Sequence, residues 1–265
     1  MIHIDSNKRV KLERAVRFFK GILFVPKCSG CGRTLPLSRL NDEEYLFCDK
    51  CLSKWEAAKL RRCPSCGQSY SECACATSYM HEAGCGVLMS LVPYSENDSD
   101  LSVVRRVLFR IKDIGDSELI NYLSKQLCYR VFPIVYEIGN ENMLVTYAPR
   151  TEKARRKKGH DQSELLAKGL SKHLGIKFAR LIERKASPNV KMQKKLQAEQ
   201  RRKNAEHSFA PSKSIQAARG KCIILIDDVA TTGASLSACA KLLKDAGASS
   251  VLCLCIAKTL QNEAK

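Results

Sequence analysis

The sequence predicts an α/β protein, in which a mostly parallel sheet with helices on both faces follows a small cysteine-rich zinc-ribbon domain. Two observations predict this class. Eight of the fourteen cysteines lie between residues 28 and 75 as four close pairs. Beyond residue 85, continuous apolar runs typical of buried strands alternate with helical patterns. We therefore divide the chain into an N-terminal basic segment (1–26), a zinc-ribbon domain (27–84) and an α/β domain (85–265).

The four cysteine pairs read CSGC, CDKC, CPSC and CAC. A Cys-x2-Cys turn aims two sulfur atoms at one point, and two pairs complete a tetrahedral thiolate site that suits structural zinc. Free thiols packed in a core are the alternative, and Cys85 is an alternative ligand for the second site. Sequential pairing predicts two sites, Cys28, Cys31, Cys48 and Cys51 and then Cys63, Cys66, Cys73 and Cys75. We expect the others to be small core residues: Cys128, Cys222, Cys239, Cys253 and Cys255.

The α/β domain begins with an apolar run at 86–94 that predicts a strand. Asp161 and Glu164 are spaced as a capping box at the start of a helix that Gly175 ends. We expect further strands at 143–148, 177–184, 222–227 and 250–257, and helices at 101–111, 117–130, 161–175 and 235–247. Ligands bind at the carboxyl ends of parallel strands, so the loops at that edge are candidate sites.

The chain carries 45 Lys and Arg residues against 27 Asp and Glu residues, a formal net charge of +18. Such an excess favours anionic partners such as phosphates and nucleic acid. Residues 150–158 contain six basic residues and one acidic residue, and residues 184–203 contain eight and one. We expect both windows to be loops or a mobile flap that attracts polyphosphate backbones, with solvated surface charge as the alternative.

No stretch of the sequence approaches the ~20 apolar residues that a membrane span needs. The apolar run near the N-terminus is too short and too late for a secretory signal. We therefore expect no membrane span and a cytoplasmic location.

The stretch LIDDVATTGAS at 225–235 joins the strand expected at 222–227 to the next helix. Unpaired amides at the helix start, with hydroxyl groups and a glycine beside them, form a cradle for a phosphate dianion. Asp227 and Asp228 would repel that phosphate, but they can accept hydrogen bonds from vicinal sugar hydroxyls. The pattern thus describes a ribose 5-phosphate site, and a capped helix after a chance Asp-Asp turn is the alternative.

IILIDDVATTGAS resembles the phosphoribosyl pyrophosphate (PRPP) motif of type I phosphoribosyltransferases. The order of cysteine pairs, YAPR, KKGHDQSELLAK, RRKNAEHSF and this motif together resemble the ComF family of competence proteins. The resemblance covers nearly the whole chain beyond residue 27. It implies a type I phosphoribosyltransferase-like fold for the α/β domain.

The resemblance also implies the residues of a PRPP site. Asp227 and Asp228 would contact the ribose hydroxyls, and the loop after them would contact the 5-phosphate. Basic residues and magnesium would face the pyrophosphate. The sequence departs from the family at His160 and Asp161, where an aromatic residue and an asparagine are usual. The implied PRPP-binding residues are Lys112, Arg150, Gly159, Gln162, Asp227, Asp228, Val229, Ala230, Thr231, Thr232, Gly233, Ala234 and Ser235.

For function, the resemblance implies a PRPP-binding zinc protein that handles single-stranded DNA during natural transformation, with a helicase and a recombination-loading protein as partners. The alternative is an active phosphoribosyltransferase that transfers ribose 5-phosphate to a base or another acceptor. The sequence assigns neither a catalytic residue nor an acceptor pocket. The cations expected to contact DNA are Arg155, Arg156, Lys157, Lys158, Lys194, Lys195, Arg201 and Arg202.

Overall fold

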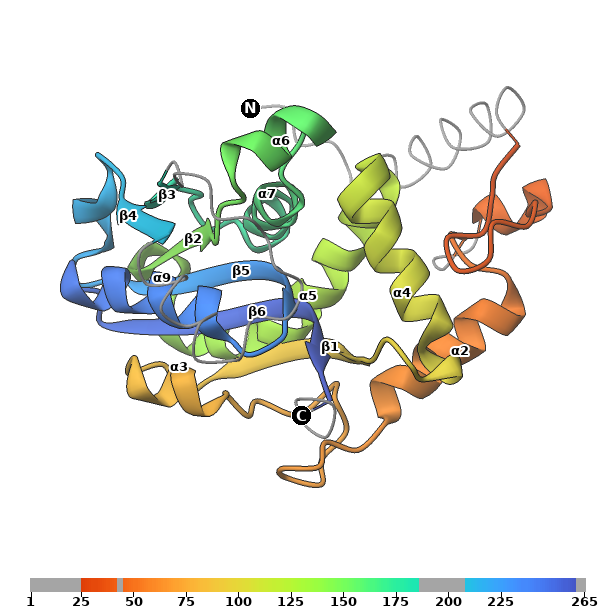
Figure 1. Cartoon of the computed structure of the whole chain (residues 1–265), viewed down its shortest axis with the longest axis horizontal. Coiled ribbons are helices and arrows are strands. Elements are labelled where there is room, and N and C mark those ends of the chain that lie inside the picture. Colours follow the sequence, from red (N-terminus) through yellow and green to blue (C-terminus); the bar gives the residue numbers. More distant parts are fainter. Residues whose placement is uncertain (1–24, 42–44, 186–207, 261–265) are drawn as a thin grey trace.

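The computed structural model describes residues 25–41, 45–185 and 208–260, and its centre is a four-stranded sheet (Figure 1). The strands are β1 (Leu88–Tyr94), β2 (Met143–Tyr147), β5 (Cys222–Ala230) and β6 (Ser250–Thr259). They run in the order β1-β6-β5-β2, and every neighbouring pair is parallel. The parallel sheet expected from the apolar runs is therefore confirmed.

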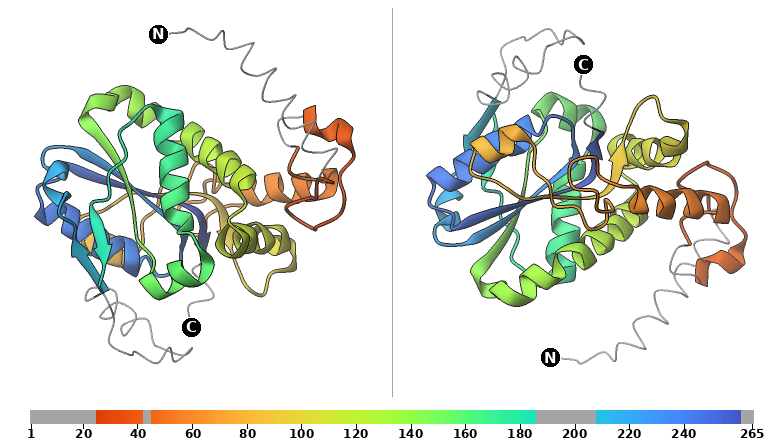
Figure 2. Two further views of the ribbon diagram at one scale, coloured as in Figure 1. Left: turned by 90° about the horizontal axis from the view of Figure 1, so that it is seen from above. Right: turned by 90° about the horizontal axis from the view of Figure 1, so that it is seen from below.

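Helices cover both faces of this sheet (Figure 2). One face packs against α4 (Ser102–Phe109), α5 (Ser117–Ile138) and α7 (Gln162–Leu174). The other face packs against α3 (Ser78–Glu82) and α9 (Ala234–Asp245). The α/β class with helices on both faces is thus confirmed, and burial on both sides explains why β5 and β6 are apolar along most of their length.

The caps of α7 follow the sequence in part. The Asp161 carboxylate accepts hydrogen bonds from the backbone N–H groups of Ser163 and Glu164, and Gly175 ends the helix with a φ of 68°. The Glu164 side chain, however, does not complete a capping box. It accepts hydrogen bonds from Tyr147 of β2 and from Arg180, and it pairs with Lys168 one turn later in α7.

The first basic window differs from its prediction, because residues 152–158 form helix α6 (Glu152–Lys158) instead of a loop. The Thr151 hydroxyl caps the helix at the Ala154 N–H, and Arg156 pairs with Glu152 one turn earlier. Gly159 ends the helix in the left-handed region with a φ of 76°. The high charge density predicts a loop here, although Thr151 and Gly159 are residues that commonly start and end a helix.

The strand expected at 177–184 is also only partly correct. Phe178 forms an isolated bridge with Val145, and only β3 (Ile182–Arg184) is a strand. It pairs antiparallel with β4 (Phe209–Pro211) outside the main sheet. The helix expected at 117–130 is longer than predicted and continues through Pro133 to Ile138.

The cysteine-rich segment packs against the α/β part through an aromatic contact. Helix α2 (Asp49–Leu60) buries Trp55, which stacks on Phe47, and Phe47 meets Tyr122 of α5 edge-on. The predicted domain division near residue 84 stays a prediction. The remaining short helical turns are η1 (Leu37–Asn41), η2 (Ser99–Leu101), η3 (Arg110–Ile114), η4 (Asn140–Asn142) and η5 (Ile215–Ala218). Among the helices of the described ranges, none is both long and apolar enough to cross a bilayer.

Candidate functional site

The acidic pair lies at the carboxyl end of β5, an inner strand of the sheet. Backbone pairing with β6 continues to Ala230, so both carboxylates are fixed by a strand. The Asp227 carboxylate accepts hydrogen bonds from the Ser163 hydroxyl at 3.1 Å and from the Asp228 N–H at 2.8 Å. The start of α7 therefore meets the end of β5 at this pair.

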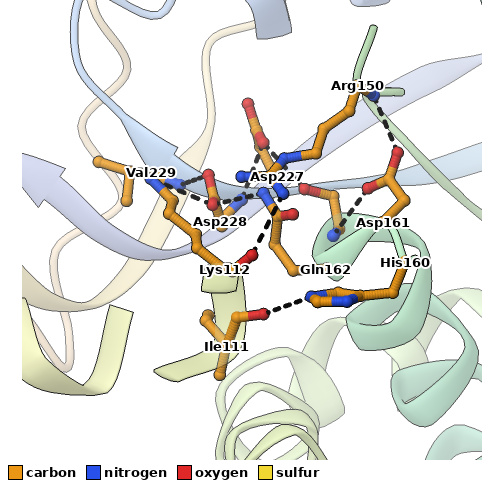
Figure 3. A network of polar contacts seen from close by, with 10 residues as sticks. Ile111, Lys112, Arg150, His160, Asp161, Gln162, Asp227, Asp228 and Val229 are labelled. Carbon is orange, nitrogen blue, oxygen red and sulfur yellow. Dashed lines mark hydrogen bonds and ion pairs between the residues drawn. The ribbon is translucent and has the colours of Figure 1, made fainter. Parts of the chain in front are cut away.

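Asp228 gathers two of the side chains that the resemblance assigned to PRPP (Figure 3). Its Oδ2 accepts a hydrogen bond from Gln162 Nε2 at 2.6 Å and lies 3.2 Å from Lys112 Nζ. The side-chain amide oxygen of Gln162, Oε1, is buried and has no hydrogen-bond partner among the described residues. A buried acceptor without a partner is costly, so the site favours a ligand that carries hydroxyl donors.

Arg150 approaches the pair from the loop after β2. Its backbone N–H donates to Asp161 Oδ2 at 2.9 Å, and its Nη1 lies 3.5 Å from the Lys112 carbonyl oxygen (Figure 3). Burial raises the pKa of Asp161, although the hydrogen bond from Arg150 acts in the other direction. Asp161 thus joins the Arg150 loop to α7 while it caps that helix.

His160, the other departure from the family pattern, connects two elements beside the site. Its ring nitrogens lie 2.9 Å from the Lys158 carbonyl oxygen and 3.0 Å from the Ile111 carbonyl oxygen. The ring therefore ties the end of α6 to η3, the turn that carries Lys112. Its place in the structure is that of a positioning residue.

The acidic pair opens into a pocket of about 180 Å³. Six sequence-predicted residues line it: Lys112, Arg150, Gln162, Asp227, Asp228 and Ser235. Seven others in the predicted set do not: Gly159, Val229, Ala230, Thr231, Thr232, Gly233 and Ala234. Four lining residues were not predicted: Ala148, Pro149, Arg184 and Phe209.

Arg184 and Phe209 form a wall of the pocket. The Arg184 guanidinium lies 4.3 Å from the centroid of the buried Phe209 ring, and burial lowers the pKa of Arg184. The two residues belong to β3 and β4, which pair across 25 residues of sequence. Arg184 opens the second basic window, but no local signal separates it from the other cations there.

The predicted phosphate loop, residues 231–235, joins β5 to α9. Gly233 has a φ of 78°, a conformation that residues with a side chain rarely adopt. The Thr232 hydroxyl accepts a hydrogen bond from the Ala234 N–H at 3.4 Å, and Ser235 reaches the pocket. A helix start, a glycine and hydroxyl groups thus lie beside the acidic pair, as a phosphate cradle requires.

Asp227 is the ionisable group that the site perturbs most. Burial, and then the adjacent Asp228 carboxylate, raise the pKa of Asp227 from 3.8 to about 7. Lys112 and the Ser163 hydroxyl act in the other direction without cancelling the effect. Near neutral pH, Asp227 is therefore protonated in a large share of the ligand-free molecules.

This shift predicts a pH-dependent stability. Between pH 4 and pH 7 the folded state binds more protons at Asp227 than the unfolded state, so the free energy of unfolding falls as pH rises through this window. Asp227→Asn removes the partly buried charge and should raise the Tm relative to wild type at pH 8 but not at pH 4. Thermal unfolding at both pH values measures this, with the exposed Asp245→Asn as control. Equal Tm differences at both pH values would contradict the assignment.

The first cysteine group joins a turn to a helix start. Cys28 and Cys31 lie on the turn before residue 33, whereas Cys48 is the residue directly before α2 and Cys51 lies in the first turn of that helix. All four sulfur atoms lie within 4.8 Å of one another, and the Cys31 and Cys48 sulfurs are 3.8 Å apart. Sulfurs bound to zinc at ~2.3 Å are about 3.8 Å apart in a regular tetrahedron, so this group could hold zinc.

The second group contains Cys63, Cys66, Cys73 and Cys75, whose sulfurs also lie within 4.8 Å of one another. Although burial alone would raise it, hydrogen bonds from Ser65 and Cys73 and the charge of Lys258 lower the pKa of Cys63 to about 6. Cys85 is not a member, because its sulfur lies 3.3 Å from that of Cys253 in the core. Both groups of four are therefore as predicted, and none of the fourteen cysteines forms a disulfide bond.

The candidate DNA-contacting cations divide into three sets. Arg155 and Lys157 are exposed on α6 and form no ion pair with any described residue. Arg156 pairs with Glu152, and Lys158 pairs with Asp113 of η3. The remaining four lie outside the described residues: Lys194, Lys195, Arg201 and Arg202.

Comparison with known proteins agrees with this architecture. Residues 160–265 match the phosphoribosyl transferase domain. The chain is 26% identical to the DNA utilization protein YhgH of Escherichia coli strain K12 over 75% of its length and 84% of that protein. It is 27% identical to the competence protein ComFC of Bacillus subtilis strain 168 over 76% of its length and 78% of that protein.

A solved structure, that of the allosteric regulatory enzyme of purine biosynthesis, matches 56% of this chain and 30% of its own at 14% identity, with a TM-score of 0.35. The curated relatives confirm the resemblance expected from the sequence motifs. The matched domain contains the acidic pair, the loop after it and the start of α7.

Proposed function

We propose, from the premise that this chain is a homologue of the ComF-family proteins with a phosphoribosyltransferase domain, that it binds PRPP and single-stranded DNA in DNA uptake. The observation that supports this most is the pairing of Asp228 with Gln162 and Lys112 beside a helix-start loop. Acceptors for hydroxyls, cations for pyrophosphate and a cradle for phosphate are the three chemistries that PRPP demands.

The residues have separate roles in this proposal. Asp227 and Asp228 accept hydrogen bonds from the ribose hydroxyls, and the 231–235 loop holds the 5-phosphate through backbone N–H groups. Lys112 and Arg150 face the pyrophosphate, whose charge magnesium would partly neutralise while keeping most of its water ligands. In the ligand-free protein, Lys112 and Gln162 both contact the Asp228 carboxylate. Binding therefore requires both side chains to leave Asp228 and to contact the ligand instead.

The relatives named for competence and DNA utilization support a role in DNA uptake. The exposed cations of α6 would contact the phosphates of the single-stranded DNA. In the same proposal, a helicase and a recombination-loading protein are the partners of this chain in DNA uptake. Single-stranded DNA binding of this kind is electrostatic and weakens steeply with salt.

A second candidate function is transfer of the ribose 5-phosphate to an acceptor. The Arg184–Phe209 wall favours it, because this wall extends the pocket beyond the groups that PRPP itself needs. The leaving pyrophosphate would be stabilised by Lys112 and Arg150, and no general acid is required.

One experiment separates the two candidates. PRPP is titrated into the protein by calorimetry with and without magnesium, and pyrophosphate release is then followed with a panel of bases. Saturable binding without release supports the binding protein, and release with one base supports the enzyme. Absence of binding under both conditions would overturn the PRPP site.

We also propose that both cysteine groups hold structural zinc, since four thiolates leave no open coordination position. The purified protein should contain close to two zinc ions per chain by elemental analysis. Cys28→Ser and Cys63→Ser should each lower this number by one, while the surface variant Lys241→Gln should not change it. A chain without zinc that is still folded would refute this prediction.

A further inference from the structure

The second cysteine group is connected to both ends of the phosphate loop. Residues 231–233 of that loop lie between β5 and α9. On one side, β6 pairs with the end of β5 and carries a buried lysine that reaches the cysteines. On the other side, the segment that follows Cys75 contacts Gly233 and the first turn of α9.

The first connection is Lys258, which is 4% exposed. Its Nζ donates to the Cys73 sulfur at 3.4 Å and to the Cys75 carbonyl oxygen at 3.2 Å. In the sheet, Lys258 is the register partner of Ala230, the last residue before the loop. A four-thiolate zinc site carries a charge of about −2, so a buried ammonium beside it has a clear electrostatic partner.

The second connection is the segment 77–80, in which Thr77 directly precedes α3 and residues 78–80 belong to that helix. The Gly233 backbone lies so close to it that an added Cβ would be 2.4 Å from Thr77 Oγ1 and 3.1 Å from Met80. The Ser237 hydroxyl of α9 donates to the Tyr79 carbonyl oxygen at 2.7 Å. Helix α3 lies against α9 (Figure 2).

The first cysteine group has different neighbours. Gly30, between two of its ligands, packs on Cys51 and on Val103 of α4. Helix α2, which supplies Cys51, contacts β1 and α4. Among the described residues, no hydrogen bond or ion pair joins this group to Lys258, to α3 or to the phosphate loop, so the two groups offer an internal comparison.

We infer that the second cysteine group, with zinc bound, sets the conformation of the phosphate loop, and that Thr77 and Lys258 are its positioning residues. Loss of the metal frees the 73–77 chain, and both connections to the loop then lose their fixed support. The first group stabilises the α2 and α4 region and leaves the loop unchanged. This inference rests on the proposed PRPP site for its effect on affinity, but not for its effect on the loop.

The test compares Cys66→Ser with Cys31→Ser, which each remove one ligand from one group. Zinc content, hydrogen exchange of peptides covering 230–237 and PRPP affinity are measured in the full chain. Both variants should lose one zinc ion. Only Cys66→Ser should show faster hydrogen exchange at 230–237. Its PRPP affinity should also fall about tenfold, because PRPP must then order the loop when it binds. Equal exchange at 230–237 in wild type and Cys66→Ser, or an equal increase in Cys31→Ser, would overturn the inference.

Lys258→Met and Lys258→Arg provide a second test that keeps all zinc ligands. Lys258→Met should release one of its two zinc ions to a chelator faster than wild type does, and its hydrogen exchange at 230–237 should be faster. In Lys258→Arg, both the zinc release and the hydrogen exchange should return to the wild-type rates. Added zinc should slow the exchange again, which a simple packing defect would not show. Lys241→Met on the exposed face of α9 is the control. If wild type does not bind PRPP, the proposed function fails, while zinc release and hydrogen exchange still decide this inference.

Discussion

Replacing Asp227 and Asp228 together by asparagine is expected to abolish measurable PRPP binding and to leave the protein folded. Each carboxylate would accept a charge-assisted hydrogen bond from a ribose hydroxyl, worth about 1.5–3 kcal/mol. Two such bonds correspond to a loss of ~10²–10⁴-fold in affinity. Calorimetric titration with PRPP and magnesium measures the effect.

The fold should tolerate this change because asparagine has the shape of aspartate. At position 227 the change also removes a partly buried charge whose repulsion with Asp228 raises the pKa of Asp227. Circular dichroism and the Tm check that the variant is folded. Asp245→Asn, at the exposed end of α9, should bind PRPP as wild type does. Unchanged affinity in the double variant would show that the pair does not bind the ligand.

Neutralising the cations of α6 is expected to weaken single-stranded DNA binding by ~10–100-fold at low salt. The variant changes Arg155, Arg156, Lys157 and Lys158 to glutamine. For every phosphate that the variant no longer neutralises, the slope of log affinity against log salt should fall by about 0.7, so four phosphates would lower it by about 2.8. Fluorescence anisotropy with a labelled oligonucleotide at several salt concentrations gives both quantities.

The structure refines this prediction. Arg156 and Lys158 are already paired with Glu152 and Asp113, so the Arg155/Lys157 double variant should account for most of the effect. A control with the same loss of charge changes four scattered exposed lysines to glutamine: Lys50, Lys172, Lys213 and Lys241. If control and α6 variant have the same slope, the cations of α6 are ordinary solvated surface charge.

Much of the site was predictable because its chemistry is local in the sequence. Asp227, Asp228 and the hydroxyl-rich loop follow one strand without interruption, and the strand itself is marked by an apolar run. The cysteine pairs carry their geometry in their spacing, since two sulfurs on one turn already point to a common centre. Asp161 and Gly175 likewise mark the ends of α7 by their own conformational preferences.

Other features depended on distant contacts and could not be predicted. Glu164 has the spacing of a capping box, but Tyr147 of β2 and Arg180, which lie outside α7, donate hydrogen bonds to its carboxylate instead. Arg184 and Phe209 meet only because β3 and β4 pair, and no local signal predicts that pairing. Helix α6 is a different case: the charge density of residues 150–158 predicts a loop, whereas the Thr151 cap and Gly159 bound a helix.

By itself, the sequence determined the class of fold, the two groups of four cysteines and the chemistry of the β5 loop. Each depends on residues within one turn, one strand or one periodic segment, where steric and solvation preferences act over short distances. Only the tertiary structure decided which cations face Asp228, what forms the pocket wall, and that the segment after the second cysteine group contacts the phosphate loop. Those contacts join segments that are far apart in the sequence, and their energies exist only after the strands have brought the segments together.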